Sequence, residues 1–319
     1  MADLDANAGA LRVVVAGASG TIGRAVVREM VSRGAKVTAL LRPGPGQRAE
    51  IPELAGAECV AAALDNGACL AVSLAAARPD VVISCIASRS GAPKDSQKVD
   101  LEANLALLAA AQSAGAEHFI LLSAICVQKP LLAFQHAKLA FEERLIASGM
   151  SYTIVRPTAF FKSLSGQVKR VKAGKPFLVF GDGALTRCKP ISDADLARFI
   201  GDCAEDPARR GAILQIGGPG PAISLREQGE LLFEMAGRPA HFKSISPKLF
   251  TYAEQVLRLG AGVSDWFAEK AEYARIARYY ATESMLVIDP ATGKYSADLT
   301  PEYGSDTLRD HYARLLAEG

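Results

Sequence analysis

The sequence predicts an α/β protein built on a doubly wound parallel sheet, with a smaller, mainly helical C-terminal lobe. Short apolar runs alternate with helical stretches over the first half of the chain, a glycine-rich turn joins the first run to the first helix, and glycine and proline become frequent after residue 157. The 319 residues are 50% hydrophobic and 22% charged, which is typical of an ordinary folded protein. The net charge of +2 offers no basic surface for nucleic acid.

Six short runs rich in β-branched residues are the predicted strands. They mostly lack polar alternation, as expected where helices cover both faces of a sheet. The strands are predicted at residues 11–16, 36–41, 58–64, 80–86, 119–123 and 152–155, and the helices between them at 24–33, 67–77, 95–114 and 134–148. Strands separated by helices of this length favour parallel pairing.

The second half of the chain is predicted to form the lobe. Helices are expected at residues 193–203, 225–235, 247–259, 266–280 and 305–316, with short strands such as 177–180. We divide the chain into an N-terminal extension (1–10), the sheet domain (11–157) and the lobe (158–319), and expect some lobe segments to return to the sheet domain. A lobe over the carboxyl ends of the strands would close a ligand cleft.

The turn after the first strand carries three glycines at G-x-x-G-x-x-G spacing. Gly17 permits a tight turn, Gly20 lets the backbone approach a pyrophosphate, and Gly23 lets helix and strand pack closely. Free N–H groups at the start of the helix favour phosphate. The turn therefore predicts a Rossmann-type nicotinamide dinucleotide site, with cofactor contacts from Gly17, Ser19, Gly20, Thr21, Ile22 and Gly23.

Arg42, at the end of the second strand, predicts the choice of cofactor. Enzymes that use NAD place an acid near this point to bind the ribose hydroxyls, and residues 37–42 contain none. The arginine offers a planar, permanently charged fork for a 2′-phosphate. We therefore expect NADPH rather than NADH, and a solvated loop charge is the alternative for Arg42.

Several other kinds of site lack sequence support. The six cysteines and four histidines form no metal-ligand spacing and no hydrolase motif, so we expect no metal site. The longest mainly apolar run, residues 119–127, is too short to span a bilayer. Residues 1–10 contain two acids and no base, unlike a signal or transit peptide, which favours a cytoplasmic protein.

Three segments, residues 99–111, 155–157 and 190–197, resemble signatures of the short-chain dehydrogenase/reductase superfamily. Longer stretches closely resemble the family of divinyl chlorophyllide 8-vinyl reductases, particularly 84–89 (SCIASR), 121–132 (LLSAICVQKPLL), 154–164 (IVRPTAFFKSL) and 279–286 (YYATESML). The resemblance implies that NADPH reduces the 8-vinyl group of divinyl chlorophyllide or protochlorophyllide to ethyl, in chlorophyll or bacteriochlorophyll synthesis. It also implies a photosynthetic organism and is compatible with peripheral contact with the photosynthetic membrane.

The superfamily's usual acid is a tyrosine four residues before a lysine, and here Phe134 stands before Lys138. A phenyl ring cannot protonate an alkoxide, which argues against a carbonyl reductase. Vinyl reduction does not require such an acid to neutralise an alkoxide, because the conjugated macrocycle delocalises the negative charge that hydride transfer leaves. The resemblance implies that Lys138 contacts the nicotinamide ribose and is a candidate proton source. It makes Ser123 a second candidate, either catalytic or orienting the substrate.

Position in the superfamily's pattern implies further contacts. Asp65 is expected near the adenine. Phe160, Phe161 and Lys162 are expected near the substrate, as an aromatic wall and a cation for a carboxylate, with core aromatics beside a surface lysine as the alternative. Cys126 is expected to be a buried thiol, and Asp100 replaces the superfamily's usual asparagine. Contacts with the ribose and nicotinamide are expected from Ala87, Ser88, Pro157, Thr158 and Phe160.

Two matters stay open at the level of sequence. An apolar stripe over residues 249–257 is predicted to pack in the core, with a substrate lid or a membrane contact as alternatives. For the function, the alternatives are an isoflavone-reductase-like NADPH reductase of another conjugated olefin and a non-catalytic NADP-sensing regulator. The retained Lys138 and the long resemblance disfavour the regulator.

Overall fold

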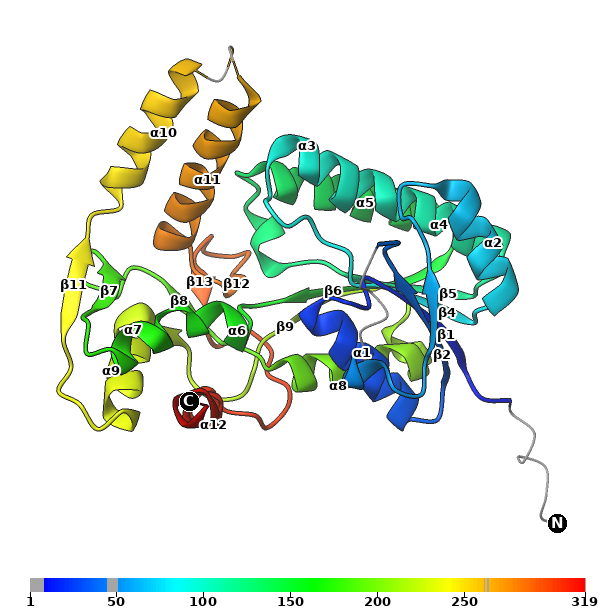
Figure 1. The fold of residues 1–319 in the computed structure, drawn as a ribbon, viewed down its shortest axis with the longest axis horizontal. Coiled ribbons are helices and arrows are strands. Elements are labelled where there is room, and N and C mark those ends of the chain that lie inside the picture. Colours follow the sequence, from blue (N-terminus) through cyan, green and yellow to red (C-terminus); the bar gives the residue numbers. More distant parts are fainter. Residues whose placement is uncertain (1–8, 45–50, 261, 263, 319) are drawn as a thin grey trace.

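The computed structural model describes residues 9–44, 51–260, 262 and 264–318, so most of the predicted extension (1–10) lies outside the described residues. Its centre is a seven-stranded parallel sheet in the order β3-β2-β1-β4-β5-β6-β9 (Figure 1). This confirms the predicted fold class. The strands are β1 (Arg12–Ala16), β2 (Lys36–Leu41), β3 (Glu58–Ala61), β4 (Val81–Ser84), β5 (His118–Leu122), β6 (Ser151–Pro157) and β9 (Ala212–Ile216).

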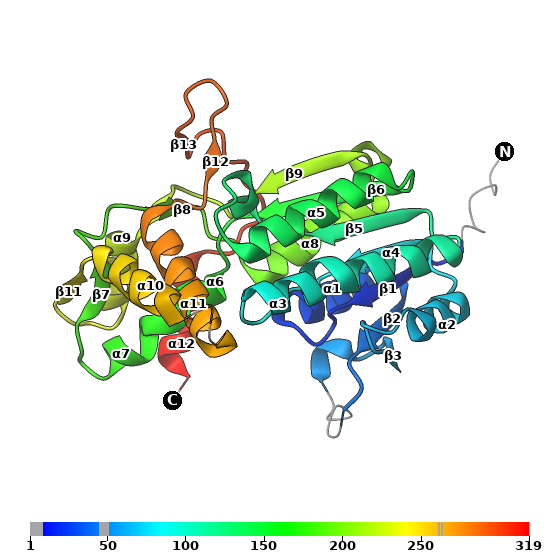
Figure 2. The same cartoon turned by 90° about the horizontal axis from the view of Figure 1, so that it is seen from above.

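Helices cover both faces of this sheet, as Figure 2 shows. One face carries α1 (Thr21–Ser32) and α8 (Asp193–Glu205), and the other carries α2 (Gly67–Ala77), α4 (Ala103–Ser113) and α5 (Ala133–Ala147). Each layer encloses its own apolar cluster.

Strand β1 shows why the strands are mainly apolar. Val13 and Val15 belong to the cluster under α1 and α8, whereas Val14 and Ala16 belong to the cluster under α2, α4 and α5. Because successive side chains point to opposite faces, a strand covered on both sides buries consecutive positions, which favours apolar residues at most of them.

Three of the differences between the observed and the predicted elements concern the sheet domain. The helix predicted over 95–114 begins at Pro93 and comprises α3 (Pro93–Ser96), a π-helical turn (Gln97–Glu102) and α4. The third strand ends at Ala61, three residues early, at the edge of the sheet. Strand β9 was not predicted, because this edge strand is only partly buried and lacks a continuous buried apolar run.

The lobe is assembled from the second half of the chain, apart from α8 and β9, which join the sheet domain. A parallel pair joins β7 (Phe177–Phe180) to β11 (Phe242–Ile245), and antiparallel pairs join β8 (Arg187–Cys188) to β10 (Ile223–Ser224) and β12 (Val287–Ile288) to β13 (Tyr295–Ser296). The helices are α6 (Phe161–Leu164), α7 (Val168–Lys172), α9 (Leu225–Met235), α10 (Lys248–Gly260), α11 (Asp265–Thr282) and α12 (Leu308–Ala317).

Helices α10 and α11 pack against each other as a hairpin that projects from the lobe (Figure 1). The prediction that residues 249–257 pack in the core is wrong for three of them, since Leu249, Tyr252 and Val256 are 59%, 63% and 67% exposed. Phe250 faces inward and contacts Phe180, with 5.6 Å between ring centroids. Within the described part of the chain, none of the helices is long and apolar enough to cross a membrane.

Candidate active site

The glycine turn lies between the carboxyl end of β1 and the start of α1. Gly17 has a φ of 77°, and a Cβ atom there would lie 2.6 Å from the carbonyl oxygen of Cys85. A Cβ atom on Gly23 would lie 2.2 Å from the carbonyl oxygen of Gly17. Both positions therefore require glycine, which lets α1 begin directly beside the strands. Gly20 is exposed, so its backbone is open to a ligand.

The start of α1 favours an anion. Arg24 donates its backbone N–H to the Gly20 oxygen and its Nε–H to the Ser19 oxygen, so the N–H groups of Thr21 and Ile22 precede the regular helical bonds. These N–H groups and the helix dipole attract negative charge. Lys162 adds a cation, since its Nζ lies 2.6 Å from the Thr21 hydroxyl oxygen.

Arg42 and Asp65 lie at the same edge of the sheet, beyond β2 and β3. Arg42 is exposed and close to Asp95, which follows β4 in the chain. Although burial opposes the shift, hydrogen bonds from Ser90 and Arg89 and the charge of Arg42 hold the pKa of Asp95 below its ordinary value. Asp65 forms an exposed ion pair with Lys98, in which the two charged atoms are 3.0 Å apart.

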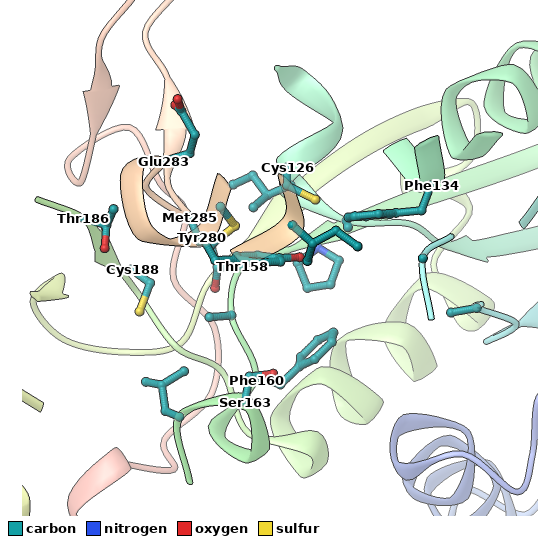
Figure 3. Close-up of a pocket in the computed structure, with 18 of the residues that line it drawn as sticks. Cys126, Phe134, Thr158, Phe160, Ser163, Thr186, Cys188, Tyr280, Glu283 and Met285 are labelled. Atoms are coloured by element: carbon teal, nitrogen blue, oxygen red, sulfur yellow. The ribbon is translucent and has the colours of Figure 1, made fainter. Parts of the chain in front are cut away.

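A cavity of about 700 Å³ lies between the carboxyl ends of β4, β5 and β6 and the lobe (Figure 3). Its size falls within the range of roughly 300–1,000 Å³ that is typical of small-molecule sites. Seven of the predicted site residues line it together: Ala87, Ser88, Ser123, Lys138, Pro157, Thr158 and Phe160. The lobe completes the walls with mainly apolar side chains, among them Phe177, Phe180, Ile223, Leu225 and Met285.

Lys138 reaches the cavity from α5 and forms a buried ion pair with Asp100. Its Nζ lies 3.0 Å from Asp100 Oδ1, and the two residues are 8% and 1% exposed. Asp100 belongs to the π-helical turn, a distortion that is frequent at functional sites. The pair fixes the Lys138 ammonium at the cavity wall, and the second Asp100 oxygen is buried without a hydrogen-bond partner among the described residues.

Ser123 lines the cavity at the end of β5, but its proton points elsewhere. Its hydroxyl donates to Glu142 Oε1 at 2.5 Å. Glu142 is 2% exposed and is paired with Arg156. A ligand in the cavity therefore meets the lone pairs of the Ser123 oxygen rather than its proton.

Of the two phenylalanines in the predicted aromatic wall, only Phe160 lines the cavity. Phe161 is 3% exposed and packs in the lobe core, where its ring centroid lies 5.3 Å from that of His311. The preceding residue, Phe160, lines the cavity instead, and Phe134 lines it from another side (Figure 3). Helix α6 begins at Phe161, so these consecutive side chains diverge. Lys162 lies at the glycine turn and is not among the residues that line the cavity.

Sequence reasoning missed Tyr280, which lines the cavity from α11. It lies in the stretch 279–286 that carries the family resemblance, but that stretch gave it no role, because only the packing of the lobe against the sheet domain brings it to the end of β5. Cys126 is 3% exposed, as expected for a buried thiol, and also lines the cavity.

Comparisons with known proteins agree with this architecture. Residues 17–207 match a family model described as NAD(P)H-binding. The leucoanthocyanidin reductase of Vitis vinifera, solved with NADPH, shares the fold with a TM-score of 0.71 at 16% identity, over 96% of this chain and 100% of that one.

Two plant relatives are much closer in sequence. The chloroplastic divinyl chlorophyllide a 8-vinyl-reductase of Oryza sativa subsp. indica is 48% identical over 96% of this chain and 79% of the relative. The protein of the same name from Arabidopsis thaliana is 47% identical over 97% of this chain and 78% of the relative. Identity at this level over nearly the whole chain shows that the protein belongs to the divinyl chlorophyllide a 8-vinyl-reductase family.

Proposed function

We propose that the protein is an NADPH-dependent reductase that converts the 8-vinyl group of divinyl chlorophyllide or protochlorophyllide to ethyl. The observation that carries the proposal is the large, mainly apolar cavity at the carboxyl edge of the sheet, in a chain whose relatives are named for this reaction. Phe134 occupies the position of the tyrosine with which carbonyl reductases protonate an alkoxide. Reduction of an alkene within a conjugated macrocycle forms no alkoxide and does not require that tyrosine. The buried Lys138 ion pair at the cavity favours an enzyme over a nucleotide-sensing regulator.

The glycine turn fits the phosphates of a dinucleotide. The close contacts at Gly17 and Gly23 and the open backbone at Gly20 leave room beside the helix start for a pyrophosphate. We infer that Lys162 contributes its charge there, rather than to a substrate carboxylate, because it contacts Thr21. The remaining pyrophosphate contacts would come from Gly17, Ser19, Gly20, Thr21, Ile22 and Gly23.

The rest of the cofactor would follow the edge of the sheet. Arg42 is assigned to the 2′-phosphate and Asp65 to the adenine. The loops after β4 and β6, and Lys138, are assigned to the ribose and nicotinamide. The loop residues in that group are Ala87, Ser88, Pro157, Thr158 and Phe160, all of which line the cavity.

Bound NADPH supplies the hydride for the reaction. The residues of the chain position the vinyl group, exclude water and allow a proton to reach the inner vinyl carbon. Phe134 and Phe160 offer flat apolar contacts for a macrocycle, and the apolar lobe residues keep water out. Lys138 holds a positive charge beside the site while Asp100 fixes its direction.

A direct assay tests the proposed function. Protein, NADPH and divinyl chlorophyllide are incubated, and absorption and product mass are followed. Loss of the conjugated vinyl group shifts the Soret band to the blue and adds two hydrogens. NADPH binding without turnover would favour the regulator, and turnover of a different conjugated olefin alone would favour the isoflavone-reductase-like alternative.

Arg42→Ala is expected to weaken NADPH binding by about 10- to 100-fold, because charge-assisted hydrogen bonds to a 2′-phosphate are lost. NADH lacks this phosphate, so its Kd should change by less than about threefold. Calorimetric titration with each cofactor checks the prediction. Arg28→Ala, which removes an exposed arginine of α1, is the control and should leave both Kd values unchanged. An equal effect of Arg42→Ala on both cofactors would exclude the assignment.

Removing the Lys138 ammonium is expected to lower kcat by about 100-fold or more. A single Lys138 variant leaves Asp100 as an unpaired buried charge, which costs about 3–5 kcal/mol and risks unfolding. The test therefore uses the double variant Asp100→Asn/Lys138→Met, which removes both charges together, and compares it with wild type. Thermal unfolding should show the double variant folded, and a wild-type kcat in that variant would remove Lys138 from the site.

The hairpin of α10 and α11 supports a peripheral membrane contact, which we propose as a second property. Its exposed apolar face consists of Leu249, Tyr252, Val256, Leu259 and Trp266, with exposed fractions between 55% and 85%. The four residues of α10 recur at helical spacing along one side. An apolar helical face of this kind inserts into the interfacial region of a bilayer.

Cations beside this face indicate an anionic lipid surface. The Arg258 side chain is 71% exposed. Lys270 lies over the rings of Trp266 and Tyr273, at 5.9 and 5.2 Å from their centroids. Glu254 and Glu272 are buried and paired with arginines, whereas Glu269, next to Lys270, is an exposed acid of the hairpin. Apolar side chains flanked by cations suit a membrane with acidic headgroups.

Flotation with phosphatidylglycerol vesicles tests the membrane contact. We expect the protein to float with these vesicles, and Leu249→Ser/Val256→Ser/Leu259→Ser to stay in the soluble fraction, because the inserted apolar area is lost. The control is Val72→Ser/Ile146→Ser/Ile213→Ser, which removes exposed apolar residues from the sheet domain. Wild-type protein that remains in the soluble fraction would contradict the proposal.

A further inference from the structure

The cavity lacks the acid that the superfamily uses, and the proposed reaction still requires a proton. Phe134 stands where the tyrosine would be, and the Ser123 proton is held by Glu142. Among the described residues that line the cavity, the remaining groups with an exchangeable side-chain proton or a charge include Cys85, Arg89, Asp100, Cys126, Lys138, Arg187, Cys188, Tyr280 and Glu283.

Most of these groups are poorly suited to donate. Arginine does not release its proton in proteins. Asp100 and Glu283 are engaged in ion pairs with Lys138 and Lys129, with charged atoms 3.0 and 2.7 Å apart. The Cys188 thiol faces the Ile223 carbonyl oxygen. Cys85 lies beside Gly17, on the side of the cavity away from the lobe.

Tyr280 is placed differently. Its ring comes from α11 and lines the cavity near Cys126 (Figure 3). Cys126 belongs to the 3₁₀ turn Ile125–Gln128, which follows Ser123 at the carboxyl end of β5. The phenol therefore reaches the region where the superfamily places its tyrosine, from another part of the chain.

The neighbouring residue fixes the position of Tyr280. The Tyr279 hydroxyl donates to the carbonyl oxygens of Cys126 and Lys129, at 3.0 and 3.3 Å. Tyr279 is 3% exposed, so this contact anchors α11 on the turn after β5. Tyr280 is 44% exposed, which leaves it accessible to water as well as to a ligand.

We propose that Tyr280 is the catalytic acid that protonates the inner carbon of the vinyl group, an inference that rests on the proposed function. The hydride supplied by NADPH forms the new C–H bond at the terminal carbon as the C=C π bond breaks. The O–H bond of Tyr280 then breaks, and its proton forms the second C–H bond at the inner carbon. NADPH leaves as NADP⁺, and the phenolate takes a proton from water.

The surroundings of Tyr280 suit this role. Desolvation raises the pKa of the phenol, so Tyr280 carries its proton before the reaction and the phenolate left after proton transfer is readily protonated again. Lys138 and Tyr280 both act on the Cys126 thiol, whose pKa is raised by burial and lowered by these two neighbours and Gln135. Lys138 and Tyr280 therefore both lie near this thiol, at the wall of the same cavity.

Tyr280→Phe tests the proposal, because it removes the proton and keeps the ring. We expect kcat to fall by about 100-fold or more, as is typical when a general acid is lost. Fluorescence quenching should give Kd values for NADPH and for divinyl chlorophyllide within about threefold of wild type, since general acid catalysis acts on the transition state. Tyr273→Phe, an exposed tyrosine of the same helix, is the matched control and should keep wild-type turnover.

A second variant keeps the test independent of packing effects. Tyr280→His restores a side chain that can donate a proton and should recover part of the activity lost in Tyr280→Phe. Wild-type turnover by Tyr280→Phe would overturn the inference and leave the proposed function standing. The inference would also be overturned if the Kd for divinyl chlorophyllide rose enough in Tyr280→Phe to explain the whole loss of turnover, because Tyr280 would then be a substrate-binding residue. Wild-type protein that fails to reduce the vinyl group would instead overturn the proposed function.

Discussion

The parallel direction of all seven strands is the constraint on which the rest of the structure depends. Because each strand runs the same way, every loop that follows a strand emerges at one edge of the sheet. Residues that are far apart in the sequence are therefore brought to this one edge. They are the glycine turn after β1, Arg42 after β2, Ser88 after β4, Ser123 after β5 and Thr158 after β6. The absence of side chains at Gly17 and Gly23 lets α1 approach this edge and bring its N-terminus to it.

The cavity combines apolar walls with one buried charge pair. A lone buried lysine would lose its proton or destabilise the fold, because removing a charge from water is costly. The carboxylate of Asp100 offsets this cost and holds the Lys138 ammonium at the wall. The Ser123, Glu142 and Arg156 network, in contrast, directs its polar groups away from the cavity. A site with few free polar groups suits a hydrophobic pigment whose own conjugation spreads the charge of the reaction.

The hairpin of α10 and α11 links the cavity to the molecular surface. The inner end of α11 contributes Tyr280 to the cavity and anchors Tyr279 on the turn after β5. The outer face of α10 leaves Leu249, Tyr252 and Val256 exposed. One helical pair thus contributes both to the wall of the proposed active site and to the face proposed to contact a membrane. This arrangement would place the cavity close to the membrane for a hydrophobic substrate.

The sequence by itself determined the features that depend on neighbouring residues, namely the type and order of the secondary-structure elements and the glycine turn. The alternation of apolar runs and helices predicted the parallel sheet, and the glycine spacing predicted the turn before α1. The place of Lys138 at the site was implied by the family resemblance. Tertiary structure decided the rest. Phe160 and Phe161 are equally apolar neighbours, and only the start of α6 between them sends one to the cavity and the other to the core. An apolar stripe on α10 does not reveal whether another element covers it, and no motif links Tyr280 to the end of β5. Such contacts join residues far apart in the chain, so they depend on how whole elements pack and leave no periodic signal in the sequence.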